Sequence, residues 1–157
     1  MRSKIGFKSL FLILIVLIFS FSFVLLSAYS EELEYLSDKM DCLELSDKFM
    51  KEILQEKFTE GFELIEPYFP ISAREFQNLI DQTEVQLRGS APNFGTMIDY
   101  EFVREETVNE FLVRYVFVIK HQYTLTRWLF VYYRPDDQWL LNSLNWDDQV
   151  SLLFANE

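Results

Sequence analysis

The chain has 157 residues, of which 50% are hydrophobic and 17% aromatic, with 14 basic and 25 acidic residues and a formal charge of −11 at pH 7. This apolar content excludes an intrinsically disordered chain. All of the acidic residues but only 11 basic ones follow residue 30, so residues 31–157 carry a formal charge of −14. The balance argues against nucleic acid as a partner, because phosphate binding needs clustered Lys and Arg side chains.

Residues 1–30 are predicted to be a signal peptide or a membrane anchor. A basic start, MRSKIGFK, precedes an apolar run at residues 9–27. The run is long enough to span a bilayer as a helix, whereas Ala28 and Ser30 fit a cleavage site, so both fates stay open. In either case residues 31–157 are expected to be exported to the periplasm, the cell surface or the medium, with membrane contact only through residues 9–27 if these are retained.

The exported part is expected to comprise an acidic spacer, residues 31–44, and one domain, residues 45–157. Cys42 is the only cysteine, which excludes an internal disulfide. We expect it to be a half-buried thiol, with an intermolecular disulfide as the alternative.

Three helices are predicted at the start of the domain. Apolar residues recur at steps of three and four in LSDKFMKEILQEKF, with Ser46 or Asp47 as the N-cap. Gly61 predicts a bend before the second helical segment. The third helix is predicted to start at the capping box SARE, residues 72–75, and to end near Leu87, where RGSAPNFG breaks it.

Four antiparallel strands are predicted next, in MIDYEFV, EFLVRYVFVIK, TLTRWLFVYY and WLLNSLNW. A short capped helix in DDQVSLLF follows. Helices that precede a run of antiparallel strands indicate an α+β fold, with the helices packed on a four-stranded sheet.

The second hairpin is predicted to turn between His121 and Gln122, which places Tyr115 opposite Trp128. A one-residue shift of the turn would break this pairing. One face, expected to receive the helices, then carries Phe111, Val113, Tyr115, Phe117, Ile119, Trp128, Phe130 and Tyr132. The other face carries Leu112, Arg114, Val116, Arg127, Leu129 and Tyr133.

Several stretches resemble a known superfamily: PISAREFQNLIDQ, the NFG before Thr96, the strand ending in IKH, and RWLFVYYRPDDQWLLNSLNWDD with its trailing LLF. They are similar to a group of uncharacterised bacterial exported proteins with the nuclear transport factor two-like fold, also called cystatin-like. The resemblance covers about residues 45–154. It implies a cone-shaped domain with a curved sheet, but its members include isomerases, dehydratases, hydrolases and binding modules, so it leaves the function open.

The resemblance also implies a pocket between helices and sheet. Enzymes of the superfamily use an Asp base, a Tyr donor or a His–Asp pair there. The one histidine, His121, is expected at a hairpin turn, which departs from the pattern of the dehydratases. An isomerase-type site of the ketosteroid isomerase kind remains, with Asp99 as base and Tyr115 or Tyr132 as donor.

The residues predicted to contact a ligand are Tyr115, Trp128, Tyr132, Arg114 and Arg127. The three aromatic side chains combine an apolar body with a polar tip that needs a partner, and core packing is their alternative role. The two arginines lie in a hydrophobic sheet, where a cation is costly unless it is paired or hydrated. They are expected either to form salt bridges on an outer face or to bind a carboxylate.

Acidic residues supply no metal site in this sequence. The adjacent Asp147 and Asp148 are expected to cap the terminal helix. If the two arginines form salt bridges, their expected partners are Asp99, Glu101 or another acid. One His and one Cys cannot build a structural zinc site, and no calcium-loop pattern is present, so we expect no metal and no cofactor.

The leading hypothesis is an exported, non-catalytic cone-fold domain that binds a small apolar ligand or a protein partner at the cell envelope. The first alternative is the isomerase-type pocket enzyme with Asp99 and Tyr115. The second is a homodimeric scaffold paired through the sheet.

Overall fold

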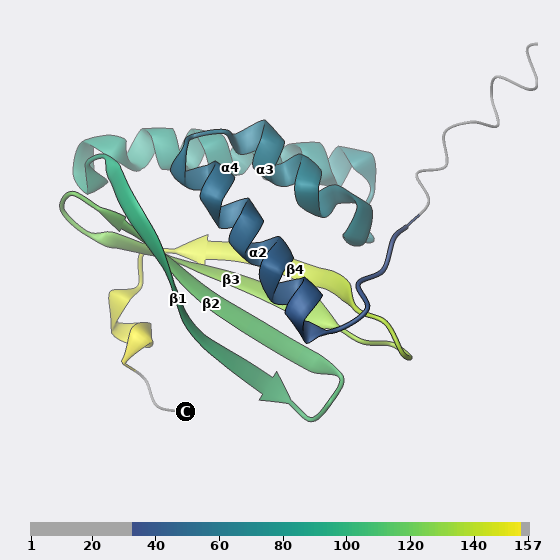
Figure 1. Cartoon of the computed structure of the whole chain (residues 1–157). Coiled ribbons are helices and arrows are strands. Elements are labelled where there is room, and N and C mark those ends of the chain that lie inside the picture. Colours follow the sequence, from purple (N-terminus) through teal and green to yellow (C-terminus); the bar gives the residue numbers. More distant parts are fainter. Residues whose placement is uncertain (1–32, 155–157) are drawn as a thin grey trace, which may run out of the picture. The chain divides into compact units, whose positions relative to one another are not determined.

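The structure is a computed structural model that describes residues 33–154. The predicted signal peptide or anchor lies outside the described residues. Three helices precede a four-stranded antiparallel sheet of order β1-β2-β3-β4, which confirms the predicted α+β class. The helices α2, α3 and α4 lie on one face of the sheet, and the short 3-10 helix η2, Val150–Leu153, lies on the other (Figure 1).

Helix α2, Lys39–Leu54, begins earlier than predicted. Its N-cap is Asp38, whose side chain accepts a hydrogen bond from a backbone N–H of the first turn. The prediction of Ser46 or Asp47 as N-cap is wrong, because Ser46 is buried inside the helix and donates to the Cys42 carbonyl. Part of the expected acidic spacer is therefore helix.

Residues before α2 also pack on the domain. The backbone of Leu36 forms an isolated antiparallel bridge with Trp139, and both side chains are buried. The described chain thus joins the core at Leu36 rather than at residue 45.

Helix α3, Phe58–Ile65, continues into the 3-10 turn η1, Glu66–Tyr68. The bend predicted at Gly61 lies instead before α3, where Glu56 adopts a φ of 59°. Gly61 is buried within α3, and a Cβ atom there would lie 3.2 Å from Ile53 Cδ1. The glycine therefore permits close packing of α3 on α2 rather than a bend.

Helix α4, Ala73–Phe94, begins with the predicted capping box of Ser72 and Glu75. It extends past Leu87 as far as Phe94, so RGSAPNFG ends the helix only at its last residue, later than predicted. Pro92 lies in the last turn, where its missing N–H removes one helical hydrogen bond without ending the helix. Gly95, with a φ of 79°, ends it.

The four predicted strands are all present, as β1 Met97–Val108, β2 Leu112–His121, β3 Leu125–Tyr133 and β4 Leu140–Asp147. Each pairs antiparallel with the next along the chain. β1 and β4 are the sheet edges, and β1 carries two register shifts.

The pairing of β2 with β3 differs from the prediction by two residues. Tyr115 lies opposite Phe130, and Trp128 opposite Phe117, because the turn comes one residue later than expected. Moving the turn by one residue changes each partner by two, which leaves every side chain on its predicted face. Phe111 lies before β2 and is 44% exposed, but the rest of the aromatic face is buried: Val113, Tyr115, Phe117, Ile119, Trp128, Phe130 and Tyr132.

Helix α2 packs on this aromatic face through Phe49. The Phe49 ring centroid lies 5.3 Å from that of Phe130 and 5.1 Å from that of Phe62, both nearly edge to face. It also lies 5.9 Å from Trp128. These contacts join α2, α3 and the sheet in one aromatic core.

Replacing Gly95 with alanine should destabilise the domain by about 1–3 kcal/mol, because the left-handed backbone is strained for other residues. The added Cβ would also lie 2.5 Å from Gln122 Cβ. Gly89→Ala is the control: its Cβ would meet nothing within 4 Å inside α4, and it should stabilise by about 0.5–1 kcal/mol. Urea unfolding of both variants would measure the difference, and equal effects would contradict the role of Gly95.

Candidate functional site: the end pocket

The predicted tyrosines lie in the closed core. Tyr115 and Tyr132 are fully buried. The Tyr115 hydroxyl donates to the Lys39 carbonyl over 2.7 Å, and the Tyr132 hydroxyl shares a 2.8 Å hydrogen bond with Ser46. Burial raises the pKa of both phenols, so they stay protonated. Their polar tips are satisfied within the protein.

Arg127 forms a bidentate salt bridge with Asp147. Its Nε donates to Oδ1 over 3.2 Å and its Nη2 to Oδ2 over 2.7 Å. Burial alone would raise the pKa of Asp147, but the hydrogen bonds from Arg127 and the Gln149 backbone hold it below its usual value. Asp147 is therefore mainly a salt-bridge partner, and Gln149 occupies the N-cap position of η2.

Arg114 pairs with Glu106, which also accepts a 2.6 Å hydrogen bond from Arg104. Partial burial opposes ionisation of Glu106, yet the two guanidinium groups lower its pKa. The two arginines thus form salt bridges on the outer face, which was one of the two expectations for them. Their partners are Glu106 and Asp147.

Asp99 and Tyr115 are not brought together. Asp99 is exposed, pairs in register with Lys120 and lies 3.4 Å from its Nζ. Paired residues share a face and neighbours along a strand alternate, so Lys120 and Tyr115 face opposite ways. The base and donor of the alternative isomerase site therefore lie on opposite faces of the sheet.

Cys42 is fully buried rather than half-buried. Burial, together with the charges of Asp41 and Asp38, raises the pKa of its thiol to about 12. The sulfur is therefore protonated and has no exposed surface for an intermolecular disulfide.

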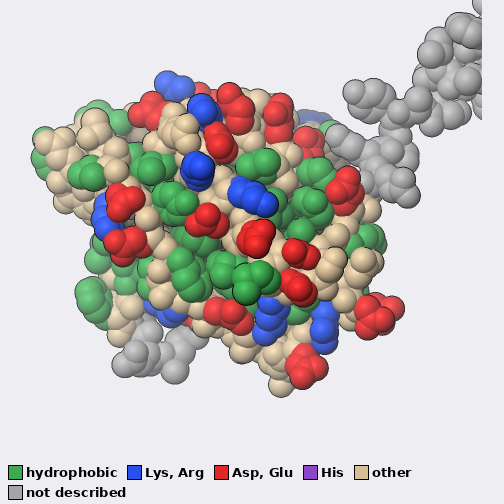
Figure 2. All heavy atoms as spheres, in the orientation of Figure 1, with side chains coloured by type: hydrophobic (Ala, Val, Ile, Leu, Met, Phe, Trp, Pro, Cys, Tyr) green, Lys and Arg blue, Asp and Glu red, His purple; other side chains and the backbone are tan. Residues whose placement is uncertain are grey.

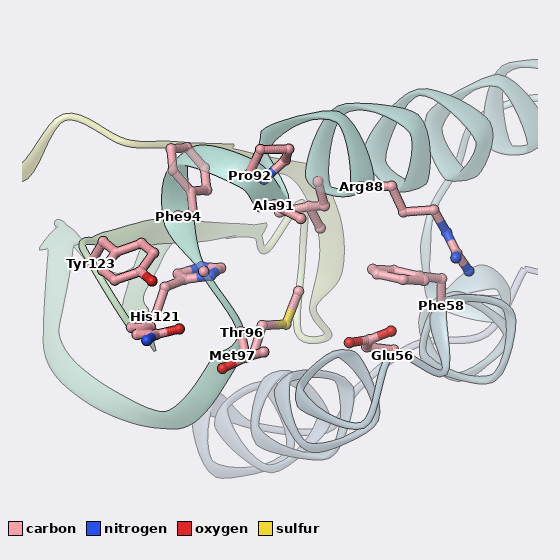
Figure 3. Close-up of a pocket in the computed structure, with 13 residues that line it drawn as sticks. Glu56, Phe58, Arg88, Ala91, Pro92, Phe94, Thr96, Met97, His121 and Tyr123 are labelled. Atoms are coloured by element: carbon pink, nitrogen blue, oxygen red, sulfur yellow. The ribbon is translucent and has the colours of Figure 1, made fainter.

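A pocket of about 370 Å³ lies where the last turns of α4 meet the β2–β3 hairpin and the connection between α2 and α3 (Figure 3). We call it the end pocket. None of the five residues predicted to contact a ligand lines it. Its walls are Glu56, Phe58, Leu87, Arg88, Ala91, Pro92, Phe94, Gly95, Thr96, Met97, His121, Gln122 and Tyr123.

His121 is the buried polar side chain of this pocket. It is the last residue of β2, directly before the hairpin turn at which it was expected, but it is only 7% exposed. Its Nε2 lies 3.1 Å from Thr126 Oγ1, and its ring lies 5.4 Å from that of Phe94. Nδ1 is buried without a well-formed hydrogen bond. Burial lowers the pKa of the imidazole, an effect that the nearby Gly95 backbone partly offsets.

The charged residues of the end pocket lie at its other end (Figure 3). Arg88 Nη2 is 2.7 Å from Glu84 Oε1, and its Cζ lies 5.9 Å from the Phe58 ring centroid. The guanidinium is thus already neutralised and stacked. Apart from Arg88 and Glu56, apolar side chains form most of the wall.

Between residues 33 and 154, no three His, Cys, Asp or Glu side chains are grouped so as to hold a metal ion. Within that same range, no helix has both the length and the apolar character needed to cross a membrane.

The free energy of unfolding should fall as the pH drops below about 6.5, because the unfolded histidine then binds protons that folded His121, with its lowered pKa, does not. The loss should stop once the pH is below the folded pKa. Glu106 and Asp147 lose their contribution only in a more acidic range. Urea unfolding between pH 7.5 and 5 should show this slope in the native chain and not in His121→Gln, and parallel curves would contradict it.

Comparison of the chain with models of known families, with curated proteins and with solved structures gave no match. The assignment of a function therefore depends on the residues and geometry described above.

Proposed function

We propose that residues 33–154 form the binding domain of an exported, non-catalytic protein and take up a small, mostly apolar molecule in the end pocket. One observation carries this proposal: a pocket of about 370 Å³ has mainly apolar walls and is lined at one end by the buried imidazole of His121. Pockets of this size with few polar groups are typical of small-molecule sites.

The surroundings of the candidate catalytic residues support a non-catalytic role. Asp99 and Tyr115 lie on opposite faces of the sheet. His121 is hydrogen-bonded to the hydroxyl group of Thr126 and not to a carboxylate that would make it a stronger base.

The proposal includes the cone-shaped, nuclear transport factor two-like fold. The quoted sequence motifs support it, together with three helices on one face of an antiparallel meander. The basic start and the apolar run at residues 9–27 support export and a place at the cell envelope.

Native mass spectrometry of the full chain, purified as the expressing cell processes it, tests this function. We expect a discrete added mass that gentle denaturation releases. Ala91→Trp should abolish it, because the indole would fill the pocket that Ala91 lines. Val85→Trp is the matched control, since Val85 lies on the same helix, is 70% exposed and does not line the pocket.

Retention of the added mass by Ala91→Trp would place the ligand elsewhere. A chain that carries no added mass, and that binds no small aromatic probe at millimolar concentration, would contradict the proposed function.

A further inference from the structure

An open, mostly apolar groove lies between α2 and the edge strand β1. Its volume is about 450 Å³, and it shares no residue with the end pocket. We call it the side groove. The residues that line it are Met40, Leu43, Glu44, Asp47, Lys48, Phe102 and Phe117.

Large apolar side chains are exposed along the side groove. Phe117 is fully buried, and the Phe102 ring packs on it with 5.3 Å between the centroids but remains 45% exposed. Met40, on the α2 side, is 61% exposed. Figure 2 shows hydrophobic side chains gathered in the middle of the face that α2 and β1 form in Figure 1, with charged ones around them. An exposed apolar area with a polar border is typical of a site where another protein docks.

Acidic groups outnumber basic ones around the side groove and along β1. Each lysine there already pairs with one or two of these acids. Asp47 pairs with no lysine in the described chain and accepts a 3.1 Å hydrogen bond from the Tyr100 hydroxyl. Five carboxylates against three ammonium groups leave a net charge of −2, from Glu44, Asp47, Asp99, Glu101 and Glu105 and from Lys39, Lys48 and Lys120.

We propose that the side groove binds a segment of another protein that presents one or two large apolar side chains flanked by Lys or Arg. This inference concerns a surface separate from the end pocket and does not depend on the proposed function. The apolar side chains would cover Met40 and Phe102, while the basic flanks would meet Asp47 and the excess of acid around it.

Charge complementarity favours this partner over the other occupants of an apolar groove. A second copy of the chain would bring the same acidic border against itself, and like charges repel. An anionic lipid surface would be repelled for the same reason. A basic segment is instead attracted, because residues 31–157 carry a formal charge of −14.

Selection of a random dodecapeptide library displayed on phage, with the full chain as the target, tests the proposal. The chain is purified as the expressing cell processes it. We expect the enriched peptides to combine a large apolar residue with neighbouring Lys or Arg. No enrichment, or enriched peptides without basic residues, would contradict the proposal.

The affinity of the most enriched peptide is then measured by fluorescence anisotropy. Met40→Ser should weaken binding about tenfold, because it removes one apolar side chain of the groove. Ile98→Ser is the matched control: Ile98 is 62% exposed, lies on β1 and does not line the groove, so binding should not change. Both positions are largely exposed, so neither variant should unfold the domain.

A second pair of variants separates local charge from the charge of the whole chain. Asp47→Asn should weaken peptide binding about threefold, as loss of one exposed ion pair predicts. Glu63→Gln also removes one negative charge, but Glu63 is exposed on α3 and outside the groove, so binding should not change. Equal weakening by both variants would reduce the binding to general attraction and overturn the proposal.

The oligomeric state of the native chain tests the alternative occupant. Size-exclusion chromatography with light scattering should show no dimer that depends on the groove. A dimer that Met40→Ser dissociates would identify a second copy in the side groove and overturn the proposal. None of these outcomes changes the expectation for the end pocket, since the two sites share no residue.

Discussion

The contact of α2 with the aromatic face of the sheet is the constraint on which the rest of the domain depends. Phe49 meets the rings of Phe130 and Phe62 nearly edge to face, an arrangement that adds about 0.5–1.5 kcal/mol per pair beyond burial. The same helix supplies hydrogen-bond partners for Tyr115 and Tyr132. Docking of α2 on the sheet therefore removes these two hydroxyl groups from solvent and also supplies the partners that replace their hydrogen bonds with water.

The closed core determines where a cavity can form. Large aromatic side chains fill the middle of the sheet under α2 and are satisfied there, which leaves that region packed. At one end of the sheet, α4 ends at Phe94 and the backbone turns at Gly95, and the end pocket lies between the last turns of α4 and the β2–β3 hairpin. The charged character of the outer face of the sheet results from strand alternation. Residues between the core positions point away from the helices and form ion pairs such as that of Arg127 with Asp147.

The alternation of side chains along the strands made the faces of the sheet predictable. The ends of the helices and the end pocket were harder to predict, because they depend on tertiary contacts. The face assignment survived an error in the turn because register errors of two residues preserve the faces. The start of α2 was not predictable from helix propensity. Serine is a common N-cap residue, yet Ser46 lies inside α2, where its hydroxyl group shares a hydrogen bond with Tyr132 of β3. Pro92 looks like a breaker but lies in a last turn that tolerates it. The pocket was missed although its signal was present, since the alternation that buries Ile119 also assigns His121 to the core face.

His121 ends the aromatic face and also belongs to the pocket, and this double position explains its chemistry. The other β2 residues on the aromatic face are apolar or, like Tyr115, have their polar atom hydrogen-bonded within the protein. Nε2 of His121 lies 3.1 Å from Thr126 Oγ1, which also accepts a hydrogen bond from Trp128, and the Gly95 backbone is the other polar group beside the imidazole. A phenylalanine at this place could keep the ring contact with Phe94 but would lose the hydrogen bond with Thr126. His121 therefore joins the end of the aromatic face to the wall of the end pocket through its contacts with Thr126 and Phe94.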